Sequence, residues 1–184
     1  MKKILNIPMI GHVYFRSKLS KILDEVFVAC CDEEINNYVK SINGKVIMTS
    51  KKHKRAVDRT EEAVRKIEKG RKKNFDLVVM IQGDEPLLIP KMISQVVAIF
   101  KKNKNVSISN LYTELKNLKE IIDPNRVKVV VDRNSNAIYF SREKISTKKI
   151  GKKKIYFKQG NIFCFKRSAL KYFVNLKPTT LENT

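Results

Sequence analysis

The chain has 184 residues, of which 42% are hydrophobic and 31% are charged, and its formal net charge is +21 at pH 7. This length and composition predict one globular domain with a substantial core. No apolar run reaches the length of a membrane span, and the amino terminus lacks the apolar core of a signal peptide. We therefore expect no membrane insertion.

The strong positive charge raises the question of nucleic-acid binding. However, 30 of the 39 basic residues are lysine, and they are spread along the whole chain. No helix-turn-helix, zinc-finger or RNA-recognition signature accompanies them. We expect a solvated lysine-rich surface with no specific nucleic acid as a partner, and a phosphorylated substrate would benefit from the same charge.

The three cysteines are Cys30, Cys31 and Cys164. Their spacing matches neither a disulfide framework nor a zinc site. Cys30 ends an apolar run and Cys164 lies inside one, so we expect both to be reduced core residues. This pattern favours a cytoplasmic protein.

Along the first two thirds of the chain, helical and strand patterns alternate. Helices are expected at residues 8–23, from a cap at Asp32 to 42, from a capping box at Asp58 to 69, and at 90–102. Strands are expected at 26–29, 45–49, 77–82 and 106–111. This alternation predicts an α/β fold with a doubly wound, mostly parallel sheet.

The pattern changes after Asp123-Pro124. Residues 127–131 and 137–140, joined by a polar turn at 133–136, predict an inserted antiparallel hairpin. A strand at 156–165 and a helix at 168–174 follow, after a basic loop at 146–154. The chain shows neither an internal repeat nor a flexible linker, which predicts that residues 1–184 form a single domain.

The run Leu77 to Ile81 is apolar throughout, which is typical of a strand buried on both faces. It ends in the sequence Gln82-Gly83-Asp84-Glu85-Pro86, in which the glycine permits a turn and the proline stops the strand. Two carboxylates therefore follow the carboxyl end of a central strand, where open α/β sheets bind their ligands. An ordinary polar turn is the alternative interpretation.

The chain resembles the 3-deoxy-manno-octulosonate cytidylyltransferases, the CMP-Kdo synthetases. The two most specific matches are Gln82-Gly83-Asp84-Glu85-Pro86 and Tyr139-Phe140-Ser141-Arg142. Further matches occur, in the same order and over nearly the whole chain, at residues 8–10, 28–33, 44–50, 58–59, 123–130 and 181–182. The resemblance implies a nucleotide-diphospho-sugar transferase type of fold.

This resemblance implies that CTP and an acidic sugar, Kdo or a relative, react to give CMP-sugar and pyrophosphate for lipopolysaccharide biosynthesis. Such a displacement depends on alignment and charge neutralisation, for which Mg²⁺ with oxygen ligands is suited. Dimers are usual in the family, so a homodimer is a further expectation.

The same resemblance implies roles for individual residues. Asp84 is the expected catalytic residue and magnesium ligand, and Arg59 matches the nucleotide-binding segment. Gln82, Arg142 and Gln159 are expected to bind substrate on the sugar side, and Glu182 is a further expected substrate-binding residue. A guanidinium fork such as that of Arg142 fits a carboxylate well, although pairing with a surface acid is an equal alternative.

The chain also departs from the family pattern. The family opens with a strand and an arginine- and lysine-bearing triphosphate loop, and it continues beyond a segment like the one that ends here. We therefore expect the domain to be incomplete at both ends, with two sheet edges exposed by the absence of a central strand. The family's Ser-Gly-Thr-Asp-Arg segment reads Arg55-Ala56-Val57-Asp58-Arg59, and the usual histidine of the sugar site corresponds to Gln159.

Two alternatives to an active nucleotidyltransferase stay open at this point. The chain could be an inactive remnant of such an enzyme, or a basic protein associated with nucleic acid. His12, His53 and Asp58 are expected to be structural, with Asp58 as a helix cap.

Overall fold

The computed structural model describes residues 1–71, 74–145, 149–150, 153–177 and 179–180. The chain divides into two compact units. Unit 1 consists of Met1–Ser109 and Ile162–Thr184, and unit 2 consists of Asn110–Asn161. In the part of the chain that the structure describes, no helix has the length and apolar character needed to cross a membrane.

Unit 1 contains most of the helices. In chain order its elements are β1 (Lys3–Ile4), β2 (Ile7–Pro8), α1 (Met9–Lys18), β3 (Val28–Cys30), α2 (Glu33–Ser41), β4 (Val46–Met48), α3 (Ala56–Lys69), β5 (Leu77–Ile81), α4 (Pro90–Lys102) and α6 (Arg167–Val174). Unit 2 contains α5 (Leu118–Ile122), β7 (Lys128–Val131), β8 (Ala137–Ser141), β9 (Lys149–Ile150) and β10 (Lys153–Lys154). β6 (Ile108–Leu115) and β11 (Tyr156–Lys166) contribute residues to both units.

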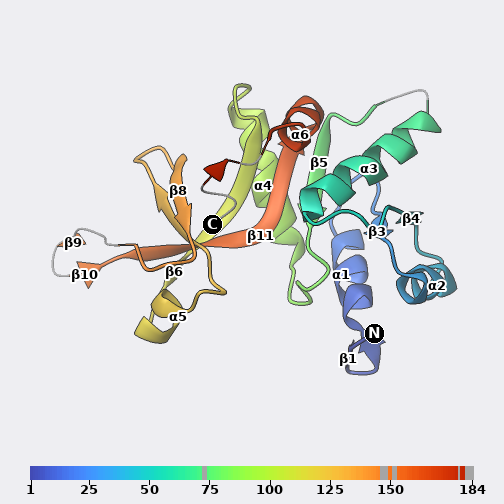
Figure 1. Cartoon of the computed structure of the whole chain (residues 1–184), viewed down its shortest axis with the longest axis horizontal. Coiled ribbons are helices and arrows are strands. Elements are labelled where there is room, and N and C mark those ends of the chain that lie inside the picture. Colours follow the sequence, from blue (N-terminus) through green and yellow to red (C-terminus); the bar gives the residue numbers. More distant parts are fainter. Residues whose placement is uncertain (72–73, 146–148, 151–152, 178, 181–184) are drawn as a thin grey trace. The chain divides into compact units, whose positions relative to one another are not determined.

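The strands of unit 1 pair in three separate groups, namely β1 with β2, β3 with β4, and β5 with β11 (Figure 1). β3 and β4 are parallel, with Val28 opposite Val46. β5 is antiparallel to the last part of β11, with Val78 opposite Phe165. The expected α/β fold is confirmed: β3 and β4 form a parallel pair, whereas β11 runs antiparallel to β5.

Two apolar clusters hold unit 1 together. One joins α3, β5, β11 and α6 through Val57, Val64, Val78, Met80, Phe165 and Leu170. The other joins α1, β3 and α2 through Tyr14, Val28, Cys30 and Val39. Burying a side chain of this size contributes about 1.5–3 kcal/mol, so the two clusters fix these helices against the strands.

The expected helix at 8–23 is too long by five residues. α1 ends at Lys18, where the backbone N–H of Ser20 donates to the carbonyl of Ser17 at 3.0 Å and tightens the last turn. Ile22 and Leu23, whose spacing suggested a longer helix, instead line a cavity in unit 1.

The helix start expected at Asp58 is also wrong. α3 begins at Ala56, and its N-cap residue Arg55 makes no side-chain capping bond. Asp58 lies in the first turn, where its carboxylate accepts two hydrogen bonds from the Arg55 guanidinium, at 2.9 and 2.8 Å. Asp58 thus has a structural role, as expected, but as an ion-pair partner.

In unit 2, β7 and β8 form the predicted hairpin, with Val129 opposite Phe140 and a register shift after Val130. Its turn is held by Asp132, whose carboxylate accepts hydrogen bonds from the backbone of Asn134 and Asn136. α5, in contrast, was not expected; its start is capped by Asn117, whose side chain accepts from the N–H of Glu120 at 2.9 Å.

Candidate functional site

The polar segment that follows β5 is anchored at both ends. The N–H of Glu85 donates to the carbonyl of Gln82 at 3.3 Å, which closes a turn directly after the strand. Three residues further on, Leu88 is only 1% exposed, and its carbonyl accepts a hydrogen bond from the Arg16 guanidinium at 3.3 Å. The sequence Gln82-Gly83-Asp84 is therefore presented from a fixed position at the carboxyl end of β5.

Asp84 is exposed at the tip of this turn. Within the residues that the structure describes, its carboxylate accepts no hydrogen bond and forms no ion pair, unlike the carboxylates of Asp58 and Glu62. A carboxylate without a protein partner is available to a cation or to a hydrogen-bond donor of a ligand.

Arg59 lies in the first half of α3 and reaches the residues that follow β4. Its Nη1 donates to the hydroxyl oxygen of Thr49 at 2.5 Å and to the carbonyl of Ser50 at 3.3 Å. Thr49 is itself buried, and its hydroxyl donates to the carbonyl of Cys30 at 3.0 Å. The guanidinium is thus held at the carboxyl edge of the β3–β4 pair.

A second charged cluster supports the same edge. The carboxylate of Glu62 accepts a hydrogen bond from the backbone N–H of Ser50 at 3.0 Å and pairs with Lys66 at 2.8 Å and with His53. The Lys66 ammonium, followed by the Ser50 N–H and His53, lowers the pKa of Glu62 to about 2. The contacts of Glu62 with His53 and with the Ser50 backbone therefore position the segment after β4.

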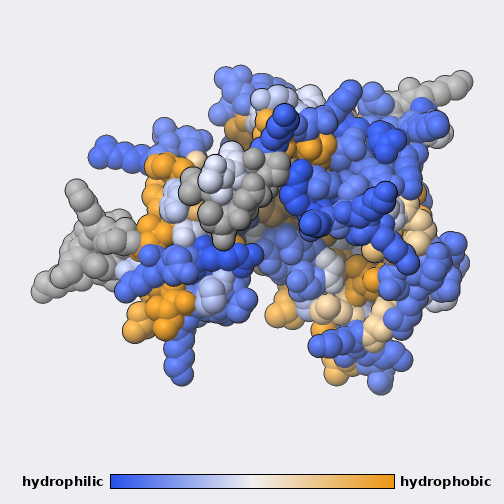
Figure 2. All heavy atoms as spheres, viewed as in Figure 1, coloured by the Kyte–Doolittle hydropathy of each residue, from blue (hydrophilic) through white to orange (hydrophobic). Residues whose placement is uncertain are grey.

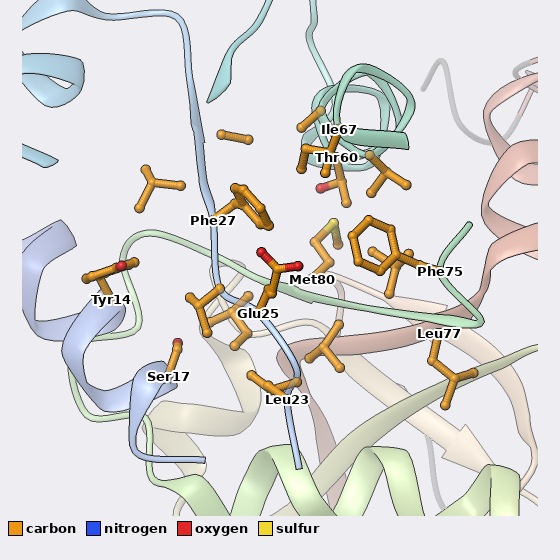
Figure 3. Close-up of a pocket in the computed structure, with 18 of the residues that line it drawn as sticks. Tyr14, Ser17, Leu23, Glu25, Phe27, Thr60, Ile67, Phe75, Leu77 and Met80 are labelled. Carbon is orange, nitrogen blue, oxygen red and sulfur yellow. The ribbon is translucent and has the colours of Figure 1, made fainter. Parts of the chain in front are cut away.

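A cavity of about 990 Å³ lies within unit 1, and its wall includes Arg59, Gln82 and Asp84. Figure 3 shows side chains of α1, of the segment leading into β3, of α3 and of β5 converging on this space. Most of the wall is apolar, and these three residues give it a polar end. Charged and polar residues that precede β3 and β5 line it as well, namely Asp24, Glu25, Arg71, Asn74 and Asp76. The structure thus brings together three of the predicted site residues.

No group of three or more potential metal-ligating side chains occurs among the described residues. Magnesium does not require one, because it commonly binds through one or two carboxylates while water and substrate phosphates supply the other ligands. An exposed, unpaired Asp84 fits that coordination, and it fits an all-protein metal cage poorly.

Arg142 lies in unit 2, directly after β8. Its Nη1 donates to the carbonyl of Pro124 at 3.1 Å, and its own carbonyl accepts from the ammonium of Lys128. Lys128 is only 1% exposed, and its Nζ also donates to the carbonyl of Asp123 at 3.0 Å. The Arg142 guanidinium is thus tied to the Asp123-Pro124 turn, and it stays exposed.

Gln159 also lies in unit 2, where it lines a small polar pocket of about 290 Å³. The other residues of this pocket include Arg126, Lys158 and Asn161. Its amide and cations are suited to hydroxyl and carboxylate groups of a small ligand. Glu182, the remaining predicted site residue, lies outside the described residues.

Sequence reasoning missed Lys128 as part of the Arg142 arrangement, although Lys128 lay within a matching segment. It also assigned no role to Arg126 and Lys158, which flank the pocket beside Gln159. The one available signal was their nearness to the Asp123-Pro124-Asn125 turn, since a polar turn before a buried strand often carries ligand-facing groups.

Comparison with known proteins gives a consistent result. The family model described as "Cytidylyltransferase" matches residues 1–184. A 3-deoxy-manno-octulosonate cytidylyltransferase of Thermodesulfovibrio yellowstonii is 41% identical over 185 residues, which cover 96% of this chain and 72% of the relative. An 8-amino-3,8-dideoxy-manno-octulosonate cytidylyltransferase of Shewanella pealeana is 36% identical over 95% of this chain and 71% of the relative.

A solved structure agrees with these sequence relatives. It is described as CMP:2-keto-3-deoxy-manno-octonic acid synthetase complexed with CTP, and it superposes with a TM-score of 0.88 at 30% identity. The match covers 99% of this chain and 73% of that structure. The expected nucleotidyltransferase type of fold is confirmed by this similarity.

Proposed function

Because the chain belongs to the cytidylyltransferase family, we propose that it transfers the cytidylyl group of CTP to Kdo or a related acidic sugar. In this reaction the anomeric hydroxyl of the sugar attacks the α-phosphorus of CTP. The bond from that phosphorus to the bridging oxygen breaks, and pyrophosphate leaves. The observation that carries the proposal is the polar end of the unit 1 cavity, where Arg59 and the unpaired Asp84 line one space.

Asp84 is the residue that we propose to hold Mg²⁺. The support is its exposed carboxylate, free of protein partners among the described residues, at the carboxyl end of β5. When bound there, the ion would neutralise charge on the triphosphate and on the leaving pyrophosphate. The turn closed by Gln82 and Glu85 keeps the carboxylate in place, so little reorganisation accompanies substrate binding.

Arg59 is proposed to bind the nucleotide phosphates. A guanidinium carries five N–H donors, and the contacts of Arg59 with Thr49 and Ser50 use Nη1. The remaining donors are available to phosphate oxygens in the cavity. The buried Thr49 hydroxyl restricts the guanidinium orientation, which favours bidentate contact.

Gln82 is proposed to bind the acidic sugar, and Arg142 and Gln159 are retained as predicted sugar-side residues from the family resemblance. Gln82 lines the cavity beside Asp84, and its amide can donate to and accept from sugar hydroxyls. The exposed Arg142 guanidinium offers a fork to the sugar carboxylate. Gln159 can hydrogen-bond a sugar but cannot transfer a proton, so we assign it to binding. We retain Glu182 as a predicted substrate-binding residue from the family resemblance.

We propose a homodimer as the working form, with the edge of unit 2 as the contact. Three consecutive residues of β8, Ile138, Tyr139 and Phe140, have exposed fractions of 66%, 53% and 45%. Figure 2 shows hydrophobic residues on the visible face of unit 2. Exposed apolar side chains on an edge strand are a frequent basis for pairing with a second chain. The three free cysteines favour a reducing compartment, so the proposed location is the cytoplasm.

The test is an assay of pyrophosphate release by the purified protein with CTP, Kdo and magnesium. The proposal predicts release that requires all three components, and mass spectrometry should detect CMP-Kdo. The inactive-remnant alternative predicts no release. A parallel assay of binding to DNA and RNA at physiological salt tests the second alternative, a basic protein associated with nucleic acid. Sequence-specific binding would support that alternative.

A further inference from the structure

Three side chains of α3 hold the backbone that leaves β4. The Lys66 ammonium donates to the carbonyl of Met48 at 2.7 Å, and the Arg59 guanidinium donates to the carbonyl of Ser50 at 3.3 Å. The Glu62 carboxylate accepts from the backbone N–H of Ser50 at 3.0 Å. Spacings of three and four residues place these side chains on one face of the helix. This face of α3 therefore determines the path of the chain directly after the strand.

Ser50 links Glu62 to Arg59, because its two backbone groups bind one side chain each. Its N–H donates to the carboxylate, and its carbonyl accepts from the guanidinium. Hydrogen bonds to an ionised group are about twice as strong as neutral ones, so the carboxylate is an effective anchor for this N–H. The position of the carbonyl that Arg59 contacts therefore depends on Glu62.

Glu62 is itself held by further contacts. One carboxylate oxygen pairs with the Lys66 ammonium at 2.8 Å, and the oxygen that accepts from Ser50 also contacts His53. The Glu62 side chain is only 12% exposed. The Lys66 ammonium, followed by the Ser50 N–H and His53, lowers the pKa of this carboxyl group to about 2, so it is ionised at neutral pH.

Two acceptors share the Nη1 of Arg59. They are the hydroxyl of Thr49, at 2.5 Å, and the carbonyl of Ser50. Thr49 is fixed by its own hydrogen bond to the carbonyl of Cys30. Because a guanidinium is planar and rigid, two fixed acceptors on one nitrogen set the direction in which the remaining donors point. If the Ser50 carbonyl moved, Thr49 would be the single acceptor left and the guanidinium could turn about it.

The three side chains of α3 differ in their relation to the cavity of unit 1. Arg59 belongs to its wall, whereas Glu62 and Lys66 lie further along the helix, outside that wall. A ligand in the cavity would therefore contact Arg59 without contacting Glu62. Any influence of Glu62 on such a ligand has to pass through the arginine.

We propose that Glu62 is a positioning residue for nucleotide binding, which acts through the Ser50 backbone to orient the Arg59 guanidinium toward the phosphates of CTP. This inference rests on the proposed function, since CTP is the ligand that Arg59 is proposed to bind. Glu62 has no contact with substrate in this role and transfers no proton. It serves as a hydrogen-bond acceptor, and the amide oxygen of a glutamine can replace it in that capacity.

The test compares Glu62→Ala with Glu62→Gln by calorimetric titration with CTP in the presence of Mg²⁺. Glu62→Ala removes the acceptor for the Ser50 N–H, so the Kd for CTP should rise by about 5-fold, the equivalent of one hydrogen bond. Glu62→Gln retains an acceptor oxygen and should keep the Kd of the unmodified protein. Glu61→Ala is the matched control, because Glu61 pairs with Arg167 and lies outside the cavity wall, and its Kd should be unchanged.

Two further readouts separate positioning from a general loss of structure. In the Arg59→Lys background, Glu62→Ala should change the Kd by less than about twofold, because the guanidinium that Glu62 positions is gone. The Nε–H resonance of Arg59 in proton–nitrogen NMR spectra reports the order of the guanidinium without any ligand. This resonance should broaden in Glu62→Ala and stay sharp in Glu62→Gln.

Three results would overturn the proposal. An equal rise in Kd for Glu62→Ala and Glu62→Gln would assign the effect to the charge of Glu62. Additive effects of Glu62→Ala and Arg59→Lys would show that the two residues act independently. An unchanged Arg59 resonance in Glu62→Ala would show that the guanidinium is oriented without this carboxylate. If the unmodified protein bound no CTP while the Arg59 resonance changed as expected, the proposed function would be wrong, and the orientation of Arg59 by Glu62 would be supported.

Discussion

The Arg59 guanidinium donates a hydrogen bond of 2.5 Å to the side-chain hydroxyl of Thr49, and through it α3 is tied to the carboxyl edge of the β3–β4 pair. Thr49 is 7% exposed, so this contact restricts the guanidinium where it enters the cavity wall. An arginine fixed in this way is suited to phosphate recognition, because little conformational freedom remains to be lost on binding.

Replacing this arginine should weaken binding of the nucleotide. Arg59→Lys keeps the positive charge but loses the forked N–H donors of the guanidinium. A charge-assisted hydrogen bond contributes about 1.5–3 kcal/mol, so the KM for CTP should rise by about 10-fold or more. Steady-state kinetics at saturating sugar provides the measurement. Arg65→Lys, at an exposed position of the same helix, is the matched control and should leave the KM unchanged. Equal KM values in the two variants would remove Arg59 from the nucleotide site.

The buried ammonium of Lys128 should matter for stability. Lys128→Met keeps the length of the side chain but removes the donors to the carbonyls of Asp123 and Arg142. A buried carbonyl left without a partner costs about 1–3 kcal/mol. Both of these carbonyls are part-buried, so we expect a loss at the lower end for the two together, about 2 kcal/mol in the free energy of unfolding. Urea denaturation monitors the change, with the exposed Lys119→Met as control. A loss below about 0.5 kcal/mol would show that water replaces the ammonium.

The contacts of Glu62 with Lys66, the Ser50 backbone and His53 make the stability of the fold depend on pH. The folded-state pKa of Glu62 is lowered from 4.5 to about 2, so its carboxylate stabilises the fold above pH 4.5. This contribution is lost as the pH falls through that window toward 2, because the unfolded state then binds the proton more readily. Thermal unfolding from pH 6 to pH 2 should show a smaller acid-induced decrease in Tm for Glu62→Gln than for the unmodified protein. Identical pH profiles would contradict this assignment.

The proposed dimer depends on the exposed apolar residues of β8. Ile138→Lys places a charge on that strand, so the protein should become monomeric in size-exclusion chromatography with light scattering. Leu5→Lys is the control, because Leu5 is 88% exposed in unit 1 and far from β8 in sequence. A dimer that persists in the Ile138 variant would exclude this surface.

Local signals in the sequence predicted local structure well. Asp32 caps α2 through hydrogen bonds from the N–H groups of Glu34 and Ile35, and α4 begins at Pro90 as expected. Both features depend on residues within one helical turn, so the sequence contains the necessary information. The end of α1 depended instead on tertiary packing, because Ile22 and Leu23 face the cavity in place of continuing the helix.

The site was predictable to the extent that motifs determined it. Gln82, Asp84 and Arg59 line one cavity, and the roles that their motif matches imply stay predictions. The burial of Lys128 was not predictable from the sequence. Its ammonium donates to the backbone carbonyls of Asp123 and Arg142, and every residue type has such a carbonyl, so the sequence does not show which residues accept. The contact of Arg142 with Pro124 was missed for the same reason.

The most direct test of the proposed function compares two aspartates at opposite ends of β5. Asp84 follows the carboxyl end of β5 and lies with Gln82 and Arg59, whereas Asp76 precedes the amino end; both are exposed and both line the cavity. Pyrophosphate release is measured with CTP, Kdo and magnesium for Asp84→Asn and Asp76→Asn. We predict a loss of about 100-fold or more in kcat for Asp84→Asn and an unchanged rate for Asp76→Asn. Full turnover by the Asp84→Asn variant at ordinary magnesium concentrations would contradict the proposed role of this carboxylate.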